Sequence, residues 1–220
     1  MSGLLSSSIA RKFAMALSAL FLVFFLLMHV SINLLSVFSE DAFNTASHFM
    51  GTNPLIQFVM QPVLMLGVLF HFILGFILEI RNRKAQVVKY AQNNGAANST
   101  WMSRNMIYSG LVILLFLAVH FVDFWFPEMN YKYIQGNPED PTRYYHELVE
   151  HFQNPIKVGI YVLAFIFLAL HLLHGFQSAF QSMGANNRKY TPGIKKFTMG
   201  YAIVVPAVFI LIVLFHFLNH

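Results

Sequence analysis

The chain has 220 residues, of which 57% are hydrophobic and only 10% are charged. A soluble domain is about 25% charged, so this composition excludes an ordinary water-soluble protein. The absence of cysteine excludes disulfides, thiolate zinc sites, an iron–sulfur cluster ligated by this chain and covalent c-type haem. The net charge of +5 is assigned to membrane-protein loops, and no binding of nucleic acid is expected.

Five stretches are long and apolar enough to cross a membrane, which takes about 20 mostly apolar residues. They cover about 13–38, 54–80, 101–126, 155–183 and 197–218. Pro54 suits the first turn of the second helix, and the third helix is expected to stop before Pro127. Residues 41–53 and a short helix at 144–152 are expected to lie on the outer surface. The sequence therefore predicts an all-α protein, with residues 1–220 forming one membrane domain of five transmembrane helices.

The basic residues predict the orientation of these helices. Eleven of the 14 lysines and arginines lie on the side of the N-terminus, and only Lys132, Arg143 and Lys157 lie on the other side. Because cytoplasmic loops of membrane proteins carry an excess of Lys and Arg, we expect the N-terminus in the cytoplasm and the C-terminus outside.

Histidines within the predicted helices are the strongest chemical signal. Ionisable residues are rare inside membranes and usually face the bundle interior. The first four helices each contain a candidate: His29, His71, His120 and His171. With a rise of about 1.5 Å per residue, the distances in sequence to the flanking charges, prolines and polar residues place the first and third of these histidines in the outer half. The second and fourth lie toward the inner side.

Two histidines at each of two depths could hold two stacked b-type haems. A lone histidine in a membrane is more often a packing residue than a ligand, but matched pairs favour haem. Depth pairs His29 with His120, and His71 with His171. His174 lies one turn beyond His171 and could replace it as a ligand or bind a haem propionate.

Two other patterns, one of histidines and one of glycines, also have simple structural explanations. His146 and His151 in HELVEH are five residues apart, so they cannot share a zinc ion as an i, i+4 pair does, and a solvated acidic helix is preferred. Gly67, Gly75 and Gly175 lie four residues from a histidine. They would let either a flat macrocycle or a neighbouring helix approach the backbone.

Five segments carry a resemblance to a known family. They are RKFAMALSALFLVFFLLMHVSIN, EDAFNTASHFM, LFHFILGF, LAVHFVDFW and LHLLHGFQSAFQSMG. In their order and spacing the chain resembles the cytochrome b membrane-anchor subunit of succinate dehydrogenases and fumarate reductases (succinate:quinone oxidoreductases), in the five-helix, di-haem class.

The resemblance implies a multi-pass protein of the bacterial inner (cytoplasmic) membrane. Such a subunit anchors an iron–sulfur subunit and an FAD-containing flavoprotein on the cytoplasmic side. It passes electrons to or from membrane quinone, commonly menaquinone, through two haem b groups, and carries out no dicarboxylate chemistry itself. The implied proximal ligands are His71 and His171, and the distal ligands are His29 and His120.

Further residues are candidates for secondary roles around these cofactors. Basic or polar groups at the inner face would bind haem propionates: Arg11, Arg81, Arg104 and His174. Hydrogen-bonding groups toward the outer end would bind the quinone head: Asn33, Ser36, Gln57, Asp123 and Trp125.

Two alternatives stay open. One is a di-haem cytochrome b of another quinone-linked dehydrogenase or of a hydrogenase, whose partner would dock on the outer side. The other is a haem-free transporter or anchor, which predicts polar residues and helix breaks that converge at the membrane midplane.

Overall fold

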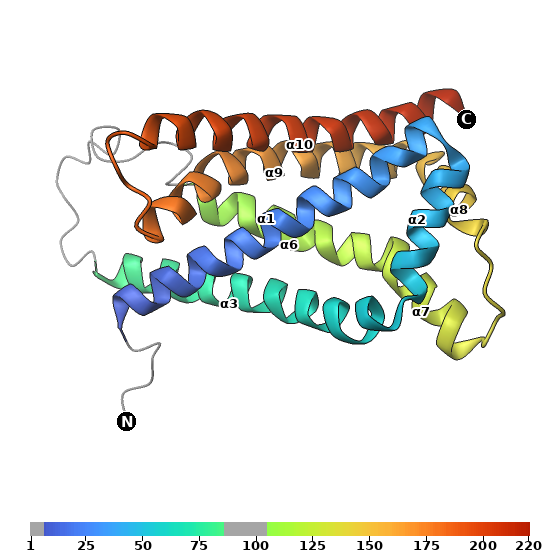
Figure 1. The fold of residues 1–220 in the computed structure, drawn as a ribbon, viewed down its shortest axis with the longest axis horizontal. Coiled ribbons are helices and arrows are strands. Elements are labelled where there is room, and N and C mark those ends of the chain that lie inside the picture. Colours follow the sequence, from blue (N-terminus) through green and yellow to red (C-terminus); the bar gives the residue numbers. More distant parts are fainter. Residues whose placement is uncertain (1–6, 86–104) are drawn as a thin grey trace.

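The computed structural model describes residues 7–85 and 105–220. All regular structure in this part of the chain is helical (Figure 1). The elements are α1 (Ser8–Phe38), α2 (Glu40–Thr52), the π-helical turn η2 (Ile56–Met60), α3 (Gln61–Ala85), α6 (Met106–His120), η3 (Phe121–Trp125), α7 (Phe126–Met129), η4 (Asn130–Ile134), α8 (Arg143–Phe152), α9 (Pro155–Ser182) and α10 (Thr191–Asn219).

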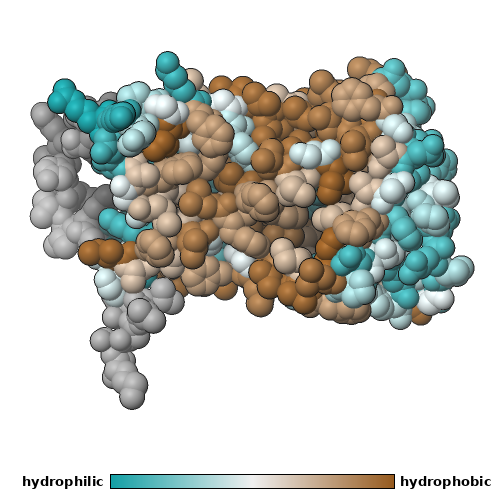
Figure 2. All heavy atoms as spheres, viewed as in Figure 1, coloured by the Kyte–Doolittle hydropathy of each residue, from teal (hydrophilic) through white to brown (hydrophobic). Residues whose placement is uncertain are grey.

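Five of these helical runs are long and apolar enough to span a membrane: 8–38, 56–84, 106–134, 155–182 and 191–219. Large apolar side chains such as Phe24, Leu66 and Leu115 are more than 60% exposed on the bundle surface. Figure 2 shows a hydrophobic band across the middle of the visible face, with hydrophilic residues gathered at both ends. The five-helix membrane architecture is as predicted, because a lipid-facing surface needs this composition.

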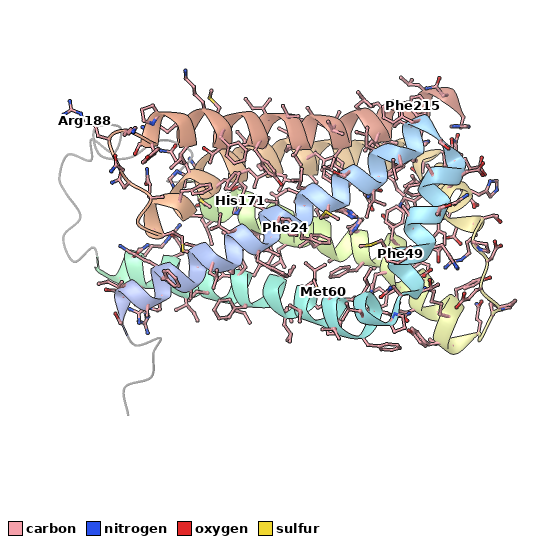
Figure 3. All side chains as sticks on the ribbon, in the orientation of Figure 1. Phe24, Phe49, Met60, His171, Arg188 and Phe215 are labelled. Atoms are coloured by element: carbon pink, nitrogen blue, oxygen red, sulfur yellow. The ribbon has the colours of Figure 1, made fainter. Side chains whose placement is uncertain are left out.

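The ends of the bundle are named after the predicted topology. The inner end is where α1, α6 and α10 begin and where α3 and α9 end, and the outer end is the opposite one. The first residues of α1 and the last of α10 therefore lie at opposite ends (Figure 1). Figure 3 shows Arg188 beyond the inner end and Phe215 close to the outer end.

Local capping explains where the second and fourth spans begin. The side chain of Asn53 accepts hydrogen bonds from the amides of Leu55 and Ile56, and Pro54 follows Asn53 directly. Asn154 likewise accepts from Ile156 N and Lys157 N ahead of α9, which starts with Pro155. An Asn cap followed by proline satisfies the free amides of a first helical turn. The short helix predicted at 144–152 occurs as α8 (143–152), and the segment 41–53, for which no helix was predicted, forms most of α2.

The prediction that the third span stops before Pro127 is wrong. The helical chain continues through α7 and η4 to Ile134. The π-helical turn η3 ends at Trp125, two residues before this proline, and the amide of Phe126 donates to the carbonyl of Phe121, five residues earlier. Because a π-turn widens the helix and shifts its hydrogen bonds, the chain passes Pro127 without ending.

The fifth span begins six residues before its predicted start, at Thr191 rather than 197, and the first begins at Ser8 rather than 13. Both additional segments are polar or basic, so an apolar criterion does not detect them. Pro192 at the start of α10 is the sequence signal for the true boundary.

Four helices surround the centre of the molecule. α1 packs against α3 and α9, and α6 packs against α9 and α3, while α10 lies along α9 and α1. The buried core is concentrated toward the outer end, where Phe152, Tyr161, Phe165 and Phe209 pack together. This arrangement leaves the interior between α1, α3, α6 and α9 for the site described next.

Candidate functional site

A cavity of about 680 Å³ runs along the interior of the bundle. It is lined at one end by Lys12 and Asn82 and at the other by Asn33 and Phe152, and most of its lining is apolar. All four candidate histidines contribute to its wall. Its volume lies within the range of roughly 300–1,000 Å³ that is usual for bound organic ligands.

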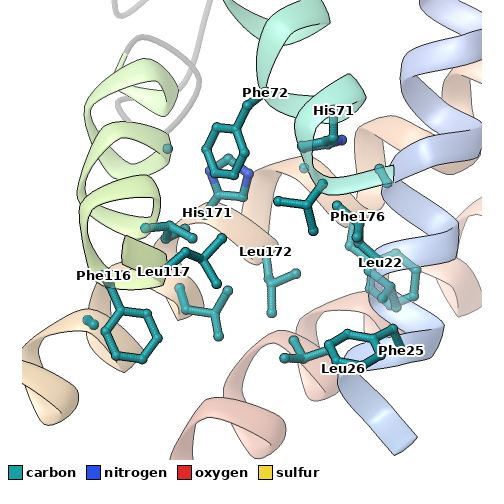
Figure 4. Close-up of a pocket in the computed structure, with 18 of the residues that line it drawn as sticks. Leu22, Phe25, Leu26, His71, Phe72, Phe116, Leu117, His171, Leu172 and Phe176 are labelled. Atoms are coloured by element: carbon teal, nitrogen blue, oxygen red, sulfur yellow. The ribbon is translucent and has the colours of Figure 1, made fainter. Parts of the chain in front are cut away.

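The structure brings the histidines together in the two pairs that depth predicts. The ring centres of His29 and His120 are 5.9 Å apart, and those of His71 and His171 are 6.4 Å apart. The planes within each pair are inclined at 83° and 70°, respectively. Figure 4 shows His71 and His171 in the cavity wall, on α3 and α9. The role of these four residues as axial ligands stays a prediction.

The spacing within each pair fits a shared metal ion. Two imidazoles that bind one metal ion, each nitrogen about 2 Å from it and each ring centre roughly 1.1 Å further back, have ring centres roughly 6 Å apart. Both observed separations are close to this value. The separation within each pair is thus compatible with one metal ion shared by its two imidazoles, and both pairs lie in the wall of the same largely apolar cavity.

Serine hydroxyls contact both histidines of the inner pair. Ser18 Oγ lies 3.1 Å from His71 Nδ1, and Ser109 Oγ lies 3.2 Å from His171 Nδ1. Each serine belongs to a different helix from its histidine, so these contacts join α1 to α3 and α6 to α9. Sequence reasoning missed both serines, because a serine in a membrane helix is commonly satisfied by its own backbone.

The outer pair is held mainly by aromatic rings. Phe25 stacks on His29 with ring centres 5.4 Å apart, and Phe116 stacks on His120 at 5.8 Å. The amide of Asn33 lies 3.4 Å from His29 Nδ1 and donates to the carbonyl of the same residue. His120 Nδ1 is buried and has no hydrogen-bond partner in the part of the chain that the structure describes. The two pairs therefore differ in their surroundings.

His171, rather than His174, faces His71. His174 lines the cavity near its inner end, and its Nε2 lies 3.3 Å from the hydroxyl of Ser178 on its own helix. This position suits the alternative role of binding an acidic group at the mouth of the cavity.

The glycines beside the histidines lie at helix contacts. A Cβ atom at Gly67 would lie 2.8 Å from Phe21, one at Gly75 would lie 3.2 Å from Met15, and one at Gly175 would lie 2.9 Å from Met106. All three neighbours are side chains of α1 or α6. Close packing of helices therefore explains Gly67 and Gly75, whereas Gly175 lies at a helix contact and also lines the cavity, so both explanations offered by the sequence fit it.

The propionate candidates are only partly placed at the cavity. The inner mouth is lined by His174 together with Lys12, Asn82 and Gln181. Arg11 is half-buried and Arg81 is exposed, and neither lines the cavity. Arg104 lies outside the described residues.

The quinone candidates are spread along the outer third of the bundle. Asn33 lines the cavity beside His29. Ser36 is buried behind it, where its hydroxyl donates to Asn33 O and lies 2.8 Å from His216 Nε2. Gln57 and Trp125 lie in the π-helical turns η2 and η3, away from the cavity lining. The structure thus brings one of these candidates directly to the cavity.

Asp123, the last candidate, is the centre of a buried polar cluster. Its carboxylate accepts from Lys157 Nζ at 2.9 Å and from Tyr161 OH at 2.9 Å, and His151 Nε2 lies 2.9 Å from it. Tyr161 also lines the cavity. The three partners were not predicted. The interpretation of HELVEH as a solvated helix fits the exposed His146 but not His151, whose side chain is only 10% exposed.

Comparisons of the chain with protein-family models, with curated proteins and with solved structures find no match.

Proposed function

We propose that this protein is a di-haem cytochrome b that carries electrons between a soluble partner at the inner end and a quinone at the outer end. The observation that carries the proposal is the arrangement of two histidine pairs, each spaced for one metal ion, in a single cavity. A haem b in each site would supply reversible one-electron chemistry.

The depth of the two sites supports transfer across the membrane. Ser18 contacts the inner pair, while His29 of the outer pair lies 11 residues further along the same helix. At a rise of about 1.5 Å per residue, the two sites are separated by roughly 16 Å along α1, about half of the roughly 30 Å hydrocarbon core.

The chain's own residues would hold, orient and shield the cofactors. Four imidazoles would provide nitrogens for the two irons, and leucine and phenylalanine side chains, among them Phe25, Leu26, Phe116 and Leu117 (Figure 4), line the same cavity and would limit the entry of water. Exclusion of water keeps the local dielectric low, so that hydrogen bonds to the imidazoles influence the potential of the iron strongly.

The partners follow from the resemblance and from charge. The exposed Arg81, Arg83 and Lys84 at the end of α3 give the inner end a basic surface for a soluble subunit. On the resemblance, we assign the chain as the membrane anchor of a succinate dehydrogenase or fumarate reductase in the bacterial inner membrane. An iron–sulfur subunit and a flavoprotein would lie on the cytoplasmic side, with menaquinone as the electron partner at the outer end.

A second candidate is the cytochrome b of another quinone-linked dehydrogenase or a hydrogenase. It is favoured by the outer end, where α2, α8 and the segment 135–142 form the most extensive non-spanning structure among the described residues. A partner that docks on this face would favour the second candidate over the first.

The first test is a count of haem in the purified protein. The pyridine haemochrome assay should give two b-type haems per chain, His29→Ala and His71→Ala should each lose haem, and the exposed His146→Ala should lose none. Iron–sulfur and flavin subunits should co-purify from the native membrane and be accessible from the cytoplasmic side. A folded chain without haem would contradict the proposal and favour the transporter or anchor.

A further inference from the structure

We propose that Ser18 and Ser109 are equivalent positioning residues that fix the tautomer of the inner histidine pair. Each would hold its imidazole with the proton on Nδ1, so that Nε2 is the nitrogen left for metal. The inference rests on the proposed function, because it assigns a task at the inner haem site.

The number of protons on a serine hydroxyl determines the direction of the two serine–histidine hydrogen bonds. A serine hydroxyl has one proton to donate and two lone pairs. Ser18 Oγ donates to Met15 O at 2.9 Å, and Ser109 Oγ donates to Met106 O at 2.9 Å. Since each hydroxyl proton is committed to the backbone, the contact with Nδ1 is made when the imidazole N–H donates to serine.

This direction determines which nitrogen is available for the iron. A neutral imidazole with its proton on Nδ1 has its free lone pair on Nε2. The same hydrogen bond limits rotation of the ring and makes Nε2 more basic, as outer contacts of metal-bound histidines generally do. Ser18 and Ser109 thus prepare both inner imidazoles in the same way.

An internal repeat supports the equivalence of the two serines. Residues 15–29 of α1 and 106–120 of α6 align without gaps, and six of the 15 positions are identical. The matched pairs are Met15 and Met106, Ser18 and Ser109, Leu20 and Leu111, Phe25 and Phe116, Leu26 and Leu117, and His29 and His120.

The repeat holds in three dimensions as well as in sequence. Phe25 and Phe116 each stack on the histidine four residues later. Met15 lies against Gly75, and Met106 lies against Gly175. Each of these glycines follows an inner histidine by four residues, at His71 and His171. The unit of α1 with α3 therefore shares its serine–histidine and methionine–glycine contacts with the unit of α6 with α9.

The spacing of 11 residues explains why one helix can serve both sites. Eleven residues are about three helical turns, so Ser18 and His29 lie on the same face of α1, as do Ser109 and His120 on α6. Each helix gives a hydroxyl to the inner pair and an imidazole to the outer pair. The inner imidazoles are tied to hydroxyls, whereas His120 Nδ1 has no such partner among the described residues.

The test uses the full chain with Ser18→Ala, Ser109→Ala and the double substitution. Ser18→Ala and Ser109→Ala should each raise the midpoint potential of the same haem, the one at the inner site, because a less basic ligand stabilises ferric iron less. The midpoint potential of the outer haem should not change. The double change should weaken binding of that haem by about 10–100-fold, the usual effect of losing outer contacts of metal ligands. Serine to threonine at either position keeps a hydroxyl and should restore the wild-type potential.

A matched control is Ser31→Ala. Ser31 is also on α1 and its hydroxyl donates to Leu27 O at 2.8 Å, but it is exposed and has no histidine contact among the described residues. It should change neither potential. A Ser18→Ala protein that keeps two haems with wild-type potentials overturns the inference while leaving the di-haem proposal intact. If the wild-type protein binds no haem, the result contradicts the proposed function itself.

Discussion

Lys157 Nζ lies 2.9 Å from Asp123 Oδ1, within the outer third of the bundle. The other carboxylate oxygen accepts from Tyr161 OH, and His151 Nε2 lies within 2.9 Å of it. The side chain of Asp123 is only 6% exposed, so its charge depends on these partners for compensation. Because the partners come from α8 and α9 while Asp123 lies in η3, the cluster joins three elements at the outer end.

Replacement of Asp123 by Asn should destabilise the outer end. Asparagine has the same shape as aspartate but lacks the negative charge that compensates Lys157. Its NH2 group is a donor and would face one of the donors that now bind the carboxylate. Hydrogen bonds to charged groups contribute about 1.5–3 kcal/mol each, so we expect a loss of about 2 kcal/mol or more in the free energy of unfolding. Thermal unfolding in detergent, followed by circular dichroism, measures it.

Glu147→Gln is the control for this substitution. Glu147 also pairs with a cation, Arg143, but its side chain is 49% exposed. Exposed pairs contribute about 0–1 kcal/mol. Equal losses in the free energy of unfolding for Asp123→Asn and Glu147→Gln would show that burial does not strengthen the interactions of Asp123.

The five spans and the pairing of the histidines could be predicted because both follow from a fixed helical rise and from charge. His29 and His120 were placed at the same depth by their distances in sequence from flanking charges and a proline, and their rings lie 5.9 Å apart. The helix beyond Pro127 was not predicted, because a proline ordinarily ends or kinks a helix, and here a rare π-helical turn lies just before it.

The serines show a second limit of sequence reasoning. Ser18 and Ser109 are unremarkable one at a time, since a buried hydroxyl can bond to its own helix. Only the offset of 11 residues to His29 and to His120, present twice, marks them. The buried partners of Asp123 come from α8 and α9, and no local pattern relates them to η3.

Replacement of Gly67 by Ala should loosen the contact between α3 and α1. The new Cβ atom would lie 2.8 Å from the ring of Phe21, which has no flexible end that can move aside. Overpacking of this kind costs about 1–3 kcal/mol. The melting temperature of the detergent-solubilised protein should fall accordingly.

Gly200→Ala provides the matched comparison. Gly200 is an exposed residue of α10, and a Cβ atom there would meet nothing within 4 Å. Alanine favours a helix by about 0.5–1 kcal/mol over glycine, so this variant should be as stable as the wild type or more stable. A Gly67→Ala protein that is no less stable than Gly200→Ala would contradict the packing argument.

Replacement of Arg143 by Lys should weaken the attachment of α8 to the preceding segment. The guanidinium of Arg143 pairs with Glu128 and Glu147 and lies 4.2 Å from the ring centre of Tyr131 and 4.5 Å from that of Tyr144. Lysine keeps the charge but cannot bridge two carboxylates in a fork or stack as a plane. We expect a loss of about 1–2 kcal/mol, with faster hydrogen exchange in 128–150. Unchanged exchange there would contradict this role.

The stability of the outer end should also depend on pH through His151. Burial lowers the pKa of His151 below its usual value of 6.5, against the opposing effect of Asp123. Between the folded pKa and about 6.5, the unfolded chain binds more protons than the folded one, so the free energy of unfolding rises with pH in this interval. The stability that neutral His151 gives the folded state is fully present above about pH 6.5 and is lost as the pH falls below it.

The melting temperature of the wild type should therefore decrease from about pH 8 to about pH 5, and the melting temperature of His151→Gln should decrease less steeply, because glutamine does not titrate. His146→Gln, which changes an exposed histidine of the same helix, should keep the wild-type slope. If the slope of His151→Gln equals that of the wild type, the pH dependence arises from another group.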